Sequence, residues 1–118
     1  MAVTTWRSID PLDALLKARG GGWIFKHSTR CPISAAAEAE FEKFAAAHPG
    51  APVYRVLVIE DRPLSNAIAE KLAIPHPSPQ AILIRDGKPI WSASHWDITE
   101  QELGAQTAAW TSHRSERS

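Results

Sequence analysis

The chain has 118 residues, of which 44% are hydrophobic and 22% are charged, a size and mix that suit one globular domain with its own core. Its 13 basic and 13 acidic residues balance, and lysine or arginine runs are lacking, which argues against nucleic acids and anionic membranes as partners. No apolar run is long enough to span a bilayer, and the N-terminus lacks the apolar stretch of a signal peptide. We therefore expect a cytoplasmic protein whose single cysteine, Cys31, stays a thiol unless it pairs with another molecule.

The first half of the chain predicts helices alternating with strands. A helix should begin at Asp10, because Pro11 follows it, and should end at the glycines 20–22. The aromatic and β-branched segment 23–26 predicts a short strand. The alanine- and glutamate-rich stretch that begins at Pro32 predicts a long helix.

The second half continues this alternation and then changes to a hairpin. Residues 53–60 form a near-continuous apolar run, which is typical of a buried parallel strand. Apolar residues recur every four positions over 64–72 and predict a short helix. Segments 81–85 and 88–94 flank an Asp-Gly pair, which favours two antiparallel strands joined by a tight turn.

A last helix should begin after Thr99, which forms a capping box with Glu102. We expect one domain over 1–111 and a disordered tail over 112–118. An N-terminal helix followed by β-α-β-α-β-β-α, with right-handed crossovers, predicts a four-stranded mixed sheet with helices on both faces. That arrangement is α/β and thioredoxin-like.

The segment HSTRCPIS places Cys31 at a strand-to-helix turn, at the N-cap of the helix that Pro32 begins. Unpaired backbone amides and the positive helix end favour a thiolate there, and Arg30 adds positive charge. The pKa of Cys31 could fall by roughly one unit from its usual value of about 8.5. Ser34 lies on the same turn and can donate its hydroxyl to the sulfur, but it cannot resolve a disulfide. An outside thiol would have to complete such a cycle.

Other interpretations of these residues are open. Cys31 could simply pack in the core, as many free cysteines do, and Ser34 could be an ordinary first-turn serine. A metal site is not expected, because no paired C-x-x-C or H-x-x-x-H motif accompanies Cys31.

A second segment is predicted to meet the cysteine across the sheet. The strand after HPSPQ should run antiparallel to the strand before Cys31, so that Ser78 and Pro79 face the sulfur. Pro79 is a candidate cis-proline, although Pro75 and Pro77 lie close by. The final strand returns SHWD to the same end of the sheet. The residues that we expect to line a site for an anionic thiol are Arg30, Pro32, His76, Ser78, His95 and Trp96.

Taken together, HSTRCPIS, RPLSNAIAEKL, SPQAILIRDGKPIW and SHWDIT make the chain resemble the monothiol bacilliredoxins over most of residues 5–110. That family carries a T-C-P-I-S active site. Here Arg30 is inserted before an intact C-P-I-S. The resemblance implies a thioredoxin fold, Cys31 as the nucleophile and Pro79 as the cis-proline.

The resemblance also implies bacillithiol, a cysteine-glucosamine-malate thiol, as co-substrate, with no tightly bound cofactor. S-bacillithiolated client proteins would be the substrates, and a separate bacillithiol-disulfide reductase would recycle the product. We expect this cycle to belong to a stress response. Two alternatives are a thiol peroxidase, in which the cysteine is oxidised to a sulfenic acid, and a non-catalytic thioredoxin-like module that binds a partner or senses redox state.

Overall fold

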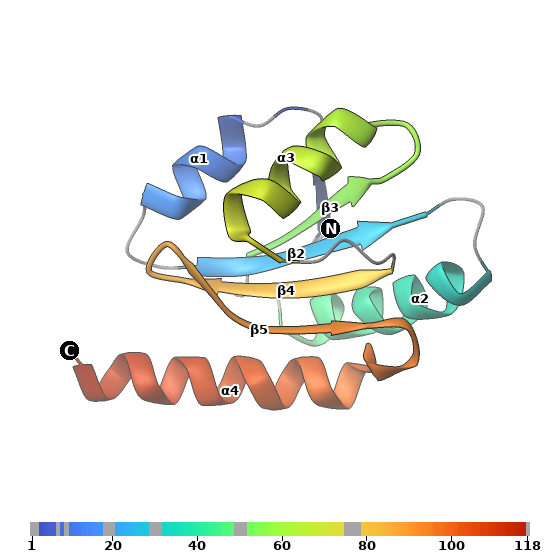
Figure 1. Cartoon of the computed structure of the whole chain (residues 1–118). Coiled ribbons are helices and arrows are strands. Elements are labelled where there is room, and N and C mark those ends of the chain that lie inside the picture. The colour runs from blue at the N-terminus through green and yellow to red at the C-terminus, as the bar shows by residue number, and fades with distance from the viewer. Residues whose placement is uncertain are drawn as a thin grey trace.

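In a computed structural model, the chain folds into a central mixed sheet with two helices on each face (Figure 1). The structure describes residues 3–6, 8, 10–17, 21–28, 32–48, 52–74 and 79–117, and gives the backbone alone for 3, 4 and 109–117. Its elements in chain order are β1 (Val3–Trp6), α1 (Asp10–Lys17), β2 (Gly21–His27), α2 (Pro32–Ala47), β3 (Val53–Leu57), α3 (Arg62–Leu72), β4 (Gln80–Arg85), β5 (Lys88–Ser94), the 3-10 helix η1 (His95–Asp97) and α4 (Glu100–Arg117).

The sheet has five strands in the order β1-β3-β2-β4-β5, so the predicted four-stranded sheet is wrong in this detail. The extra strand is β1, which runs parallel to β3 with Val3 opposite Val53 and Trp6 opposite Val56. Four residues, VTTW, carry too short a pattern to predict a strand, and β1 forms because the edge of β3 gives it backbone partners. The remaining architecture is the predicted thioredoxin-like one, with β4 antiparallel to β2.

Two hydrophobic cores lie on the two faces of the sheet. Trp23, Phe25 and Phe41 belong to the core under α2 and α4, and the Trp23 indole donates to the Thr107 hydroxyl at 2.8 Å. Ile24 and Ile68 belong to the core under α1 and α3. Because β2 is buried on both faces, its side chains alternate between these cores. Its last residues, Lys26 and His27, lie at the end of the sheet and precede Cys31 in the sequence.

Several boundaries differ from the sequence prediction. The strand predicted for 23–26 begins at Gly21, because β2 approaches β4 so closely there that a Cβ on Gly21 would collide with the carbonyl of Ile84. The strand predicted for 53–60 ends at Leu57. α4 continues to Arg117, into the segment predicted as a disordered tail, and no proline or glycine after Gly104 interrupts it.

The hairpin between β4 and β5 is confirmed. Asp86 and Gly87 both have positive φ, at 51° and 83°, as a tight two-residue turn requires. The capping box is also present, since the backbone N–H of Glu102 donates to the Thr99 hydroxyl at 3.1 Å. Within the described part of the chain, no helix is both long and apolar enough to cross a membrane.

Candidate active site

The predicted site lies where β2 ends and α2 begins, at one end of the sheet (Figure 1). Pro32 is the first residue of α2 and is exposed, and Cys31 immediately precedes it in the chain. Four of the predicted site residues lie outside the described residues: Arg30, Cys31, His76 and Ser78. The site is therefore described through the elements that flank them.

Ser34 connects the described residues on either side of the cysteine in the sequence. Its side chain is fully buried on the first turn of α2, and its hydroxyl oxygen accepts the backbone N–H of Ser28 at 3.2 Å. This bond ties the chain just after β2 to the first turn of α2, with residues 29–31 between them. A hydroxyl that accepts one hydrogen bond still has its own proton to donate.

A buried polar group supports the end of β2 from the face that α2 covers. His27 is 7% exposed and its Nε2 lies 3.7 Å from Glu38 Oε1. Arg55 Nη1 donates to Glu38 Oε2 at 2.7 Å and to Glu42 at 3.3 Å, which fixes the carboxylate beside the imidazole. Arg55 and Glu38 were not among the predicted site residues, although a charged residue in the otherwise apolar run of β3 was a signal.

Lys26 lies under the opposite face of the sheet. Its side chain is fully buried, and its Nζ donates to the backbone carbonyl of Ser65 on α3 at 3.1 Å. Burial lowers the pKa of Lys26 from 10.5 to about 8, because an ammonium loses hydration there. The end of β2 thus places one titratable side chain, Lys26, on the α3 face and another, His27, on the α2 face.

Pro79 and His95 meet at the same end of the sheet, as the sequence predicted. Pro79 is buried immediately before β4, and its carbonyl accepts the backbone N–H of His95 at 3.1 Å. His95 has a φ of 55°, a left-handed conformation that is uncommon for a histidine and costs backbone energy. The bend turns the chain out of β5 into η1, and η1 packs against α2.

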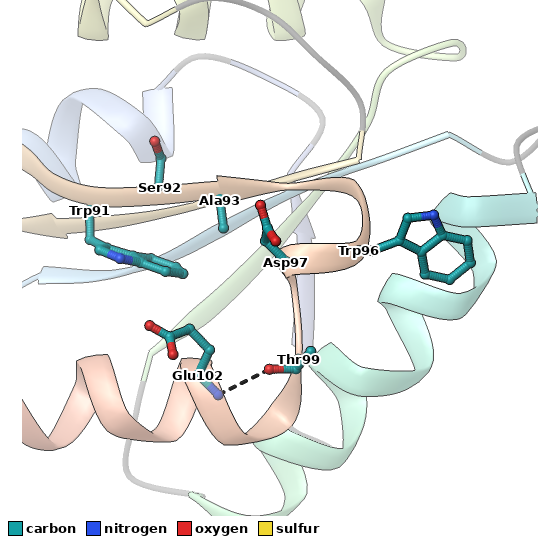
Figure 2. A pocket seen from close by; sticks show the side chains of 7 residues that line it. All are labelled: Trp91, Ser92, Ala93, Trp96, Asp97, Thr99 and Glu102. Atoms are coloured by element: carbon teal, nitrogen blue, oxygen red, sulfur yellow. Dashed lines mark hydrogen bonds between the residues drawn. The ribbon is translucent and has the colours of Figure 1, made fainter.

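Trp96 projects from this bend and is 69% exposed, a large fraction for an indole. Figure 2 shows it pointing away from the neighbouring side chains toward the beginning of α2.

The Glu40 carboxylate on α2 accepts the backbone N–H of Glu100 at 2.8 Å, and this bond holds the pKa of Glu40 below its usual value. The bond fixes the start of α4, and with it η1, to α2.

An open pocket of about 420 Å³ adjoins η1 (Figure 2). The residues that line it come from β5, η1 and the start of α4: Trp91, Ser92, Ala93, Trp96, Asp97, Thr99 and Glu102. Of these, only Trp96 was a predicted site residue. The pocket depends on β5 and α4 packing side by side, which no local sequence pattern encodes.

Comparison with known proteins agrees with this architecture. The family model described as monothiol bacilliredoxin BrxC matches residues 6–103. A solved structure described as an oxidoreductase with a thioredoxin fold is 33% identical, with a TM-score of 0.81 over 88% of this chain and 92% of that one.

Two more distant structures share the fold alone. Thioredoxin from Trypanosoma brucei brucei is 16% identical with a TM-score of 0.74, over 92% of this chain and 89% of that one. Thioredoxin from Malassezia sympodialis is 19% identical with a TM-score of 0.73, over 92% and 90%. With its family match over residues 6–103, the chain belongs to the monothiol bacilliredoxins and is a thiol oxidoreductase of thioredoxin-like fold.

Proposed function

We propose that the protein removes bacillithiol from protein mixed disulfides, with Cys31 as the nucleophile. The observation that carries the proposal is the buried Ser34 hydroxyl, which joins the end of β2 to the first turn of α2 around the cysteine-bearing loop. Cys31 directly precedes that turn in the chain, so the free amides and the positive end of a 16-residue helix can stabilise its thiolate.

The reaction takes place in two exchanges. The Cys31 thiolate attacks the bacillithiol sulfur of the mixed disulfide, a new disulfide forms between Cys31 and bacillithiol, and the client leaves as a thiolate. A second bacillithiol thiolate then attacks the bacillithiol sulfur on Cys31. Bacillithiol disulfide leaves, and the Cys31 thiolate is restored. No second protein cysteine is needed, and the chain contains none.

The surrounding residues suit the binding of an anionic thiol in this scheme. We assign Arg30, His76 and His95 to its carboxylates, and the exposed indole of Trp96 to its sugar. Pro32, Ser78 and Pro79 would position the reacting sulfurs through their backbone. We assign Pro79 as the cis-proline on the family resemblance; it is buried immediately before β4, and its carbonyl accepts the backbone N–H of His95.

The scheme also sets the partners. Bacillithiol is the co-substrate, S-bacillithiolated proteins are the clients, and a separate reductase returns bacillithiol disulfide to the thiol. We place this cycle in the cytoplasm, where reducing conditions keep Cys31 a thiol between turnovers. Demand for it would rise in oxidative stress.

Intact mass measurements test the proposal. Reduced protein is mixed separately with bacillithiol disulfide, glutathione disulfide and peroxide, and then with an excess of the matching thiol. We expect a single bacillithiol adduct that excess bacillithiol removes, forming at least about tenfold faster than the glutathione adduct, a difference of ~1.4 kcal/mol in activation free energy.

Cys31→Ala is the matched control and should form no adduct. Equal rates with the two disulfides would refute bacillithiol as the preferred thiol. Addition of oxygen atoms by peroxide, without thiol adducts, would instead indicate a peroxidase. An unreactive cysteine would leave a non-catalytic binding module.

A further inference from the structure

The outer edge of β5 offers backbone groups for another chain. β5 is the last strand in the sheet order, and it pairs with β4 with Ala93 opposite Ala81. The bond from the His95 N–H to the Pro79 carbonyl marks a hydrogen-bonded position of this ladder. Hydrogen-bonded positions alternate along antiparallel strands, so the N–H and C=O of Ser92 and Ser94 point away from β4.

The first part of β5 is protected against pairing and the last part is not. Lys88 and Pro89 begin the strand, and a bulge near Ile90 breaks the register with β4. Charge, proline and bulges are the usual means by which edge strands avoid new partners. Residues 91–94 carry none of them, and Ser92 is exposed.

The pocket described above lies along this unprotected part and has the chemistry of a cation site. Figure 2 shows the Trp91 ring extending from β5 and the Glu102 carboxylate rising from α4 toward it. Asp97 adds a second carboxylate, and the seven lining residues include no basic side chain. Carboxylates bind guanidinium groups with two parallel hydrogen bonds, and indole faces attract the same cation.

We propose that this edge and pocket bind an extended client segment that carries an arginine. The segment would add to residues 91–94 through the backbone groups of Ser92, and the guanidinium would enter the pocket between Trp91, Asp97 and Glu102. A free amine would use the carboxylates but not the planar stacking, so arginine is favoured over lysine.

The pocket includes residues of η1, which packs against α2. Trp96 lines the pocket and points toward the beginning of α2, which Cys31 precedes in the sequence. A chain lying along β5 past Trp96 would therefore extend toward the beginning of α2. That the occupant is a client rests on the proposed function, whereas recognition of the arginine itself does not.

Cysteine-free peptides test recognition of the arginine separately from the proposed exchange reaction. The whole protein is titrated into labelled eight-residue extended peptides, and binding is measured by fluorescence anisotropy. One peptide has a central arginine, and the other two carry citrulline or glutamate at that position. We expect the arginine peptide to bind at least about tenfold more tightly than either. The Asp97→Asn/Glu102→Gln double variant should remove this preference, and added salt should weaken it.

Glu70→Gln is the matched control, since Glu70 is an exposed carboxylate on α3 and should leave binding unchanged. Exchange of bacillithiol disulfide should be the same in the double variant and the wild type, because Asp97 and Glu102 are not among the residues assigned to bacillithiol or to the reacting sulfurs. Equal binding of the arginine and citrulline peptides, or an arginine preference that survives in the double variant, would overturn the inference. Loss of exchange in the wild type would refute the proposed function and leave the peptide result standing.

Discussion

Raising the pH from 7 to 10.5 is expected to stabilise the wild-type fold, through Lys26, by about 3 kcal/mol more than a Lys26→Met variant. The side chain is fully buried, and its pKa is about 8 in the folded protein against 10.5 for an ordinary lysine. Each pH unit between these values corresponds to about 1.36 kcal/mol. The expected gain is therefore large compared with the total stability of a small domain.

The direction follows from proton binding in the two states. Below pH 8, Lys26 is charged in both states, and the folded protein bears the cost of a buried ammonium. Between pH 8 and 10.5 the unfolded chain binds more protons than the folded one, so the free energy of unfolding rises with pH. Above 10.5 the side chain is neutral in both states and the gain is complete.

Urea unfolding at intervals from pH 7 to 10.5 measures this effect. Lys26→Met should lose the rise, since methionine fills a similar volume without a proton to bind. Lys17→Met, at an exposed lysine on α1, should keep it. Parallel curves for wild type and Lys26→Met would show that Lys26 does not titrate in the folded state as its burial requires.

Lys26 also illustrates what the sequence could predict. The alternation of helices and strands, the hairpin at Asp86 and the thioredoxin-like arrangement followed from local periodicity and turn chemistry. The strand β1 could not be predicted in this way, because four residues are too few to show a strand periodicity, and β1 is recognised only by its pairing with β3. In the same way, Lys26 in a short aromatic strand gave no local sign that it would be buried against the carbonyl of Ser65.

The candidate site also has one part that the sequence predicted and another that it did not. Pro79 and His95 were placed together because strand directions alone determine which ends meet, and the structure joins them by a hydrogen bond. The Glu38–Arg55 pair and the pocket beside Trp91 were missed, because each depends on side chains from elements whose packing distance the sequence does not specify. The sequence thus predicted at which end of the sheet the candidate site lies. The side chains that pack around that end depend on three-dimensional packing and could not be predicted.

Replacing Ser34 with alanine is expected to lower the free energy of unfolding by about 1 to 2 kcal/mol, although the change removes a single oxygen atom. The fully buried hydroxyl accepts the backbone N–H of Ser28, and alanine would take this acceptor away. Ser65→Ala is the matched control. Ser65 is also fully buried, but its hydroxyl has no hydrogen-bond partner among the described residues, so its removal should be neutral or stabilising.

Urea unfolding of both variants measures the stability difference, and alkylation of Cys31 as a function of pH measures the effect on the thiol. Ser34→Ala should slow alkylation at pH 7 by roughly threefold to tenfold and move the pH profile upward, because a hydroxyl that donates to the sulfur favours the thiolate. Ser65→Ala should leave the profile unchanged.

The two measurements separate two roles of the serine. Reduced stability with an unchanged alkylation profile would mean that Ser34 only holds the loop, and equal stability of the two alanine variants would contradict even that role. If both quantities change, the serine of C-P-I-S is more than a replacement for a resolving cysteine. A monothiol enzyme, whose nucleophile must await an outside thiol in each cycle, would then use the fourth residue of its motif to keep that nucleophile placed and ionised.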